Sequence, residues 1–248
     1  MENLNLILPE IFISLAIMVF LILGVFKKRS SSLIYNLTTI SLVILLAIVF
    51  NLNSISETAL FNESYKIDNL SNFMKIIMIA SGIFVMLSSS KYLQINKINK
   101  IEYPVLILSA ILGMMVMISS NDLIVFYMGL ELQSLALYVL ASFNRDNLLS
   151  TESGLKYFIL SALSSGLLLY GCSLIYGFSE TTNFNEIFKN SNNAEYGFTF
   201  GIVFILVGLA FKISAVPFHM WAPDVYQGSP TSVTIFFAIL PKIAALTV

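Results

Sequence analysis

The sequence predicts an all-α integral membrane protein, a polytopic bundle of about eight transmembrane helices. Of its 248 residues, 57% are hydrophobic and only 11% are charged, and the mean hydropathy is +0.86. Soluble domains carry about 45 to 50% apolar and about 25% charged residues. Eight apolar stretches, each close to the length that crosses a bilayer, lie at 4–26, 33–51, 70–90, 103–120, 123–143, 151–178, 197–215 and 230–248.

The starts of these stretches are consistent with helices. The first stretch is expected to be a permanent span and not a cleaved signal peptide, because no Lys or Arg precedes it. Asp122 is expected to cap the fifth helix, Ser150 or Thr151 the sixth, and Ser229 the eighth. Each helix therefore has a polar residue near its predicted start where one is needed.

The distribution of positive charge predicts the orientation. Lys66 and Lys189 lie in the two longer connections, 52–69 and 179–196, which are polar and predict surface loops. The other seven loop cations lie on the opposite side and are Lys27, Lys28, Arg29, Lys91, Lys97, Lys100 and Arg145. By the positive-inside rule that side is cytoplasmic, so the N-terminus is expected outside.

The composition excludes several kinds of chemistry. The net charge is −1, which argues against a nucleic-acid-binding surface. With one cysteine, Cys172, and one histidine, His219, this chain alone cannot build a disulfide framework, a Cys-and-His zinc site, an iron–sulfur cluster or a bis-histidine haem. We therefore expect no metal site and no cofactor in this chain, and chemistry that uses carboxylates, lysines and water.

Two ionisable residues lie deep in predicted spans, where a charge costs about 2.5 to 3.5 kcal/mol and normally marks an ion pathway. Glu131 is roughly 13 Å into the fifth helix; the alternative is a neutral carboxyl hydrogen-bonded in the core. Lys212 lies far into the seventh span, and Pro217 predicts a helix break near 215–217. Broken spans often line a hydrated ion site; alternatively, Lys212 reaches the inner interface.

The remaining membrane charges are less deeply placed or less distinctive. Lys242 follows Pro241, which removes a helical hydrogen bond and predicts a local opening. Lys156 lies near the inner start of the sixth span, so either burial or snorkelling is expected. Lys75 and Glu10 lie near the outer ends of their spans and are interpreted as interfacial anchors.

His219 lies just beyond the predicted break, in a segment that also contains Trp221. Its ordinary pKa is near neutrality, so it is a candidate proton relay; the alternative is a structural histidine. Trp221 is interpreted as an aromatic residue of the membrane interface.

At these residues the sequence resembles the antiporter-like membrane subunits of respiratory complex I (NADH:quinone oxidoreductase), and within them the subunit N branch, called subunit 2 in mitochondria. The signature is the run GLAFKISAVPFHMWAPD at 208–224. Three further parts of the resemblance are Leu8-Pro9-Glu10, the stretch from 129–135 to 155–165, and the run DVYQGSPT at 224–231 leading to Pro241-Lys242. The resemblance covers essentially the whole chain.

The resemblance implies a fold of about 14 helices with two inverted five-helix repeats. Residues 1–102 would form three leading helices and residues 103–248 the first repeat. The second repeat would be absent from this chain, so a fragment of a longer protein is expected. The family's proton-translocating residues correspond to Glu131 in the fifth helix, Lys156 in the sixth, Lys212 in the broken seventh and Lys242 in the eighth, with His219 as a connecting histidine.

The implied function is proton translocation driven by quinone reduction elsewhere in the complex. Flavin, iron–sulfur clusters and quinone would be bound by partner subunits, so the chain would belong to an enzyme without carrying a redox centre. The partners would be other membrane subunits of complex I, lipid, protons and water, with no nucleic acid. The location would be the bacterial inner membrane, or the mitochondrial inner membrane if the protein is organellar.

Two alternatives use the same residues differently. The first is a proton-coupled cation antiporter subunit, or a hydrogenase-type membrane subunit, of the same fold. The second is a passive scaffold that joins neighbouring subunits, in which the buried charges would be replaceable by neutral residues.

Overall fold

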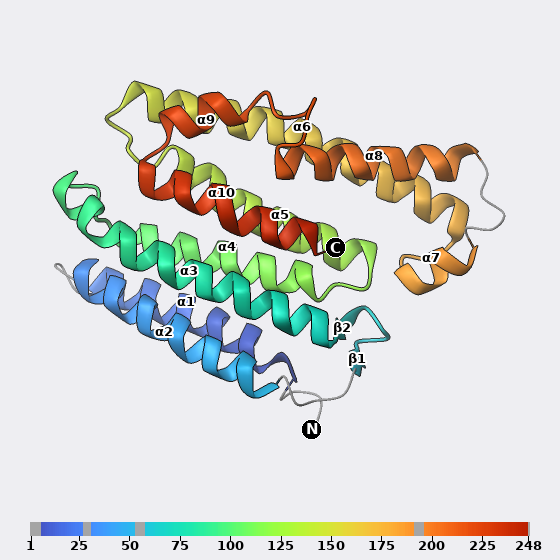
Figure 1. Cartoon of the computed structure of the whole chain (residues 1–248), viewed down its shortest axis with the longest axis horizontal. Coiled ribbons are helices and arrows are strands. Elements are labelled where there is room, and N and C mark those ends of the chain that lie inside the picture. The colour runs from blue at the N-terminus through green and yellow to red at the C-terminus, as the bar shows by residue number, and fades with distance from the viewer. Residues whose placement is uncertain (1–5, 27–30, 53–57, 191–195, 248) are drawn as a thin grey trace.

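The computed structural model describes residues 6–26, 31–52, 58–190 and 196–247 (Figure 1). Eight apolar helices dominate the described residues. They are α1 (Leu8–Phe26), α2 (Ser31–Leu52), α3 (Asn69–Ile95), α4 (Glu102–Ile118), α5 (Leu123–Ala141), α6 (Leu148–Ser179), α8 (Tyr196–Ile213) and α10 (Thr231–Leu246). The smaller elements are the helices α7 (Phe184–Asn190) and α9 (Ala222–Gly228) and the strands β1 (Thr58–Leu60) and β2 (Tyr65–Ile67).

The predicted all-α membrane fold is confirmed. Among the described residues, six helices are long and apolar enough to cross a membrane, and α4 and α10 are shorter apolar helices. All eight coincide with the predicted stretches to within a few residues. The residues expected at the very ends, 4–5 and 248, and the basic residues 27–29 lie outside the described part of the chain.

The predicted break in the seventh span is also confirmed. Helix α8 ends at Ile213, Ser214 has a positive φ of 62°, and regular helix resumes only at α9. Helix α10, in contrast, continues without interruption through Pro241. The sequence predicted a local opening at Pro241, but this proline does not break α10.

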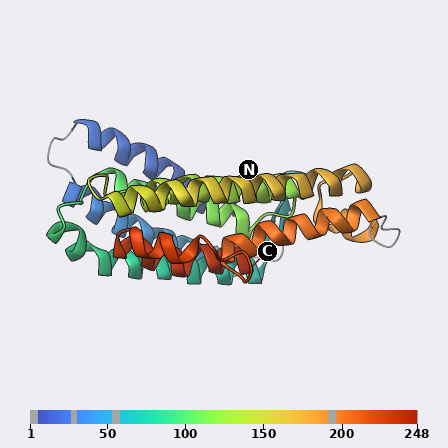
Figure 2. The same cartoon turned by 90° about the horizontal axis from the view of Figure 1, so that it is seen from above.

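The helices lie along the long axis of the molecule in a flattened bundle (Figures 1 and 2). Helix α6 runs most of this length, whereas α8 and α10 start from opposite ends (Figure 1). We call the end that carries β1, β2 and α7 the hairpin end, and the end that carries the α3–α4 turn and Arg145 the basic end. Adjacent helices pack in pairs, chiefly α6 with α8, α4 with α5, and α2 with α3.

Glycines allow two of these pairs to approach closely. A Cβ atom at Gly129 of α5 would lie only 2.8 Å from the Met117 backbone nitrogen of α4. A Cβ atom at Gly171 of α6 would lie 2.8 Å from the Gly201 carbonyl oxygen of α8. Small residues at such contacts are typical of membrane helix pairs, where packing drives association.

The connections at the hairpin end are more structured than expected. Residues 58–67, predicted as a surface loop, form an antiparallel hairpin in which Thr58 pairs with Ile67. The Lys66 amide donates to the Ser119 carbonyl oxygen at 2.8 Å, which ties β2 to the α4–α5 turn. Residues 184–190, also predicted as loop, form α7.

The helix caps are partly as predicted. Asp122 caps α5 by accepting hydrogen bonds from Ile124 N and Val125 N. The prediction for the sixth helix is wrong, because α6 begins one turn earlier and Asn147 caps it. The prediction for Ser229 is also wrong, because this residue ends α9 and makes no side-chain cap on α10.

The close α6–α8 packing predicts the effect of a single methyl group. Gly171→Ala should destabilise the protein by about 1 to 3 kcal/mol, because overpacking forces the helices apart. Thermal unfolding of the full-length protein in detergent measures this effect. Gly166→Ala on the same helix is the matched control, because a Cβ atom there meets nothing within 4 Å. Equal destabilisation by both changes would contradict this packing.

Candidate functional site

Lys212 is buried among three apolar helices. Its residue is 5% exposed, and it lies in the last turn of α8, directly before the break. The Nζ atom donates to Ser134 Oγ on α5 at 2.8 Å and to Ser161 Oγ on α6 at 2.7 Å. It also lies 5.9 Å from the centroid of the Tyr138 ring. Lys212 therefore faces the bundle interior, as the sequence predicted.

The serines connect Lys212 to a wider hydrogen-bond network. Ser134 Oγ donates to the Leu130 carbonyl oxygen at 2.7 Å, one turn earlier on α5. Ser161 Oγ also accepts from the Tyr138 hydroxyl at 2.8 Å. A buried ammonium is thus stabilised by neutral hydroxyl groups, and no carboxylate among the described residues forms an ion pair with it.

Glu131 lies one turn before Ser134 on α5, near the same part of the bundle. No ion pair joins it to Lys212, whose Nζ atom donates to Ser134 Oγ and Ser161 Oγ. Its Oε1 atom is buried and has no hydrogen-bond partner. The structure therefore places Glu131 and Lys212 in one region without direct contact, and their coupling stays a prediction.

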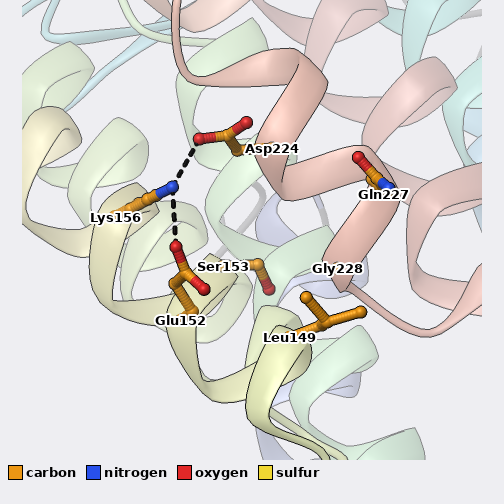
Figure 3. A pocket seen from close by; sticks show the side chains of 7 residues that line it. All are labelled: Leu149, Glu152, Ser153, Lys156, Asp224, Gln227 and Gly228. Carbon is orange, nitrogen blue, oxygen red and sulfur yellow. Dashed lines mark hydrogen bonds and ion pairs between the residues drawn. The ribbon is translucent and has the colours of Figure 1, made fainter.

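Lys156 is exposed and held by two carboxylates (Figure 3). Its side chain is 43% exposed and forms ion pairs with Glu152 on α6 at 2.8 Å and with Asp224 on α9 at 2.6 Å. A small cavity of about 90 Å³ lies beside these three residues. Helix α9 packs closely against α6 at Gly228. A Cβ atom there would lie only 2.4 Å from the Leu149 carbonyl oxygen, so glycine leaves the room that this contact needs.

The hydrogen bonds of Lys212 Nζ go to neither of the other two predicted residues, Lys242 and His219. Lys242 on α10 is half-buried, and its Nζ atom lies 5.7 Å from the centroid of the Tyr226 ring, within the range of a cation–π contact. His219 lies in the non-helical segment between α8 and α9, and its Nδ1 atom is buried without a partner. An unpartnered ring nitrogen can donate or accept a proton.

Trp221 was interpreted as an interfacial residue, and this is wrong. It is 3% exposed and stacks between Tyr157 and Phe211. Its Nε1 atom donates to the Phe211 carbonyl oxygen at 2.9 Å, a group in the last turn of α8. Trp221 therefore holds the non-helical segment after α8 against the bundle. The hydropathy of the predicted spans could not show this contact.

Glu10 and Lys75 were also interpreted as interfacial, and this is wrong as well. They are 6% and 2% exposed, and Lys75 Nζ lies 2.7 Å from Glu10 Oε1. The prediction failed because exposure was inferred from the position of each residue along its helix, and because residues 52–69 were predicted as a loop. The hairpin covers both side chains, and Tyr65 of β2 contacts them.

Sequence reasoning missed Asp224, Glu152, Ser134 and Ser161 as partners of the lysines. Only Glu152 had a detectable signal, because it precedes Lys156 by four residues on one helix. Ser and Thr are common in membrane helices, so the serines gave no distinctive signal. Within the described part of the chain, no three His, Cys, Asp or Glu residues gather as a metal site would require.

Comparison with known proteins gives consistent matches. The family model described as NADH:quinone oxidoreductase/Mrp antiporter, TM, matches residues 120–248. The NADH-quinone oxidoreductase subunit N of Pelagibacter ubique (strain HTCC1062) is 71% identical over 248 residues, which are 100% of this chain and 53% of that protein. The chain spans about half the length of the curated relatives it matches.

Two solved structures share the fold. A chain of respiratory complex I from Thermus thermophilus with bound aureothin gives a TM-score of 0.83 and 28% identity, covering 96% of this chain and 52% of that chain. A chain of the membrane-bound sulfane sulfur reductase, an archaeal respiratory membrane complex, gives a TM-score of 0.86 and 22% identity, with coverages of 96% and 51%.

The hydroxyl contacts of Lys212 predict a stability effect. Ser134→Ala/Ser161→Ala should destabilise the protein by about 1.5 to 3 kcal/mol per lost bond, because the ammonium stays buried without acceptors. Adding Lys212→Met should recover most of this loss. Thermal unfolding of the full-length protein in detergent measures both effects.

Ser165→Ala is the matched control for this prediction. Ser165 is buried on the same helix as Ser161, but its hydroxyl has no hydrogen-bond partner. Its removal should be nearly neutral. If Lys212→Met failed to rescue the double serine variant, the serines would act on stability independently of the lysine.

Proposed function

The chain belongs to the NADH:quinone oxidoreductase/Mrp antiporter membrane family, and we propose that it acts in a proton-translocating membrane subunit of an NADH:quinone oxidoreductase. The family membership confirms the resemblance inferred from the sequence motifs. The work of such a subunit is driven by quinone reduction elsewhere in the complex. The chain itself has one cysteine and one histidine, which supports the proposal that flavin, iron–sulfur clusters and quinone are bound by partner subunits.

The main observation in support of the proposal is the burial of Lys212. An ammonium in an apolar bundle is costly, and such groups normally face ion or proton pathways. Its contacts with Ser134 and Ser161 are to neutral hydroxyls, which support either protonation state.

The proposed mechanism assigns a role to each predicted residue. Protonated Lys212 is stabilised by the charge of Glu131. When that charge moves or is neutralised, Lys212 releases its proton toward Lys242 along water molecules. Lys156 and His219 supply the connection to the basic end of the bundle.

The geometry of α6 supports the position of Lys156 in this route. Lys156 and Ser161 lie on one helix and are separated by five residues, roughly 7.5 Å along the axis. Ser161 contacts Lys212, so the exposed cluster of Lys156, Glu152 and Asp224 is close to the buried lysine. A proton that reaches Lys156 from the aqueous side therefore has a short remaining distance to Lys212.

The proposed location is the bacterial inner membrane, with the basic end facing the cytoplasm and the N-terminus outside. Four described cations at the basic end support this orientation, namely Lys91, Lys97, Lys100 and Arg145. We further propose that residues 1–102 form a leading unit and residues 103–248 the first antiporter-like repeat. The partners would be other membrane subunits of the complex and the lipid bilayer.

A second candidate function is proton-coupled cation antiport, because the matching family model also describes Mrp antiporters. It uses the same buried lysine and the same fold. Dependence of transport on sodium in the purified complex, at constant proton gradient, would favour this candidate.

The mechanism predicts that Glu131 and Lys212 act as one unit. Glu131→Gln should impair proton pumping and the NADH oxidation coupled to it, whereas Glu131→Asp should retain a fraction of both. The double variant Glu131→Gln/Lys212→Met should be little worse than the more damaging single change, because residues that share one function are not additive. Proton uptake and NADH oxidation by the reconstituted complex are measured together.

Assembly of the complex is the necessary control for these variants. Wild-type pumping by an assembled Glu131→Gln complex would reject the coupled unit. It would favour the remaining alternative, a passive scaffold that joins neighbouring subunits.

A further inference from the structure

A second group of buried charges lies at the hairpin end, far from Lys212. We call Glu10 of α1, Tyr65 of β2 and Lys75 of α3 the Glu10 cluster. Lys75 Nζ donates to Glu10 Oε1 at 2.7 Å and to the Tyr65 hydroxyl at 3.0 Å, and the Tyr65 hydroxyl donates to Glu10 Oε1 at 2.6 Å. The three residues are 6%, 6% and 2% exposed. Three elements separated in sequence thus enclose one ion pair.

Apolar side chains close the Glu10 cluster from the surface. Leu6, Leu60 and Ile67 are buried around Tyr65 in a small hydrophobic group separate from the main core. The ammonium of Lys75 and the carboxylate of Glu10 are in direct contact, so the pair is net neutral.

Glu10 keeps one unused position for a proton. Its Oε2 atom is buried and has no hydrogen-bond partner, while both contacts in the cluster go to Oε1. A buried ion pair is weak evidence for stability, and a structural pair gains only if the remaining lone pairs are satisfied. Inside a membrane span, ionisable groups of this kind normally serve transport.

From these observations we propose that the Glu10 cluster is a second proton-exchange site of this chain, in the leading helices and separate from Lys212. The proposal rests on the proton-translocating function proposed above. It adds a proton-binding position outside residues 120–248, the part that matches the family model.

The proton transfer within the cluster needs no external reactant, and the protons taken up and released afterwards are those that the proposed function translocates. The proton of Lys75 Nζ moves to Glu10 Oε1 across 2.7 Å, which converts ammonium and carboxylate into amine and carboxylic acid. The second route runs through Tyr65: its hydroxyl takes the proton from Lys75 and gives its own to Glu10. The net charge of the cluster is zero before and after either transfer, so neither adds a charge to the protein interior. The amine then accepts a new proton, and the acid releases the old one.

The hairpin links this site to the helix that carries Glu131. Tyr65 forms an antiparallel bridge with Ser120, and the Asn121 amide donates to the Ser64 carbonyl oxygen at 2.9 Å. The next residue, Asp122, caps α5. A change in the Glu10 cluster therefore acts on the start of α5 through hydrogen bonds.

The test uses the full-length protein in the assembled complex. Glu10→Gln/Lys75→Met removes both charges together and keeps similar side-chain volumes, so no charge is left buried alone. Lys66→Met/Asp68→Asn is the matched control, because it neutralises a more exposed ion pair of 3.4 Å at the same end of the bundle. The readouts are the number of protons pumped per NADH oxidised, and infrared difference spectra of the complex during turnover.

The double variant should assemble, lose part of the proton-to-NADH ratio, and lose a carboxylic acid band that the wild type and the control show. A purely structural pair predicts a wild-type ratio and no change in that band. A wild-type ratio in the double variant would overturn the proposal. If that variant does not assemble, Glu10→Gln decides, because it keeps the side-chain volume and an oxygen for Lys75 and removes the carboxylate that both transfer routes need; a wild-type ratio there would overturn the proposal equally.

Lys212→Met, measured in parallel, separates this proposal from the proposed function. A reduced ratio in Lys212→Met with a wild-type ratio in the double variant rejects only the Glu10 cluster as a proton site. Wild-type ratios in both reject the proposed function itself.

Discussion

The structure depends on how a bundle of apolar helices accommodates the buried ammonium of Lys212. The ammonium needs hydrogen-bond acceptors within about 3 Å, and side chains from neighbouring helices supply them here. Ser134 and Ser161 do so from α5 and α6. A serine side chain is short, so the helix backbones must lie close together. The Gly171 contact between α6 and α8 allows that approach. The close packing of the helices is therefore required for the hydrogen bonds of the buried lysine.

The two buried lysines meet this constraint in different ways. Lys75 is paired directly with a carboxylate, so the Glu10–Lys75 pair is net neutral. Among the described residues, Lys212 Nζ donates hydrogen bonds to the neutral hydroxyls of Ser134 and Ser161 and forms no ion pair with Glu131. The two ammonium groups are therefore buried in different ways, that of Lys75 beside a charged partner and that of Lys212 among hydroxyl groups.

The sequence predicted the helices well because hydropathy is a property of consecutive residues. Pro217 predicted the break because proline acts on its immediate neighbours. The errors concern contacts between residues distant in the chain: Glu10 with Lys75 is separated by 65 positions, and Lys156 with Asp224 by 68. Depth along a helix does not equal exposure when a hairpin folds over the helix end. The hairpin itself was missed because each strand has only three residues.

The break after Lys212 also has an electrostatic consequence. The carbonyl groups in the last turn of a helix carry a partial negative charge, which stabilises a nearby cation by about 0.3 to 1 kcal/mol and up to about 2 in buried positions. Lys212 lies in that last turn because α8 ends at Ile213. A continuous helix would offer no such charge at this depth. The Phe211 carbonyl in this last turn accepts hydrogen bonds from the Ser214 amide at 3.1 Å and from Trp221 Nε1 at 2.9 Å. Trp221 thus stabilises the helix end that in turn stabilises the buried ammonium.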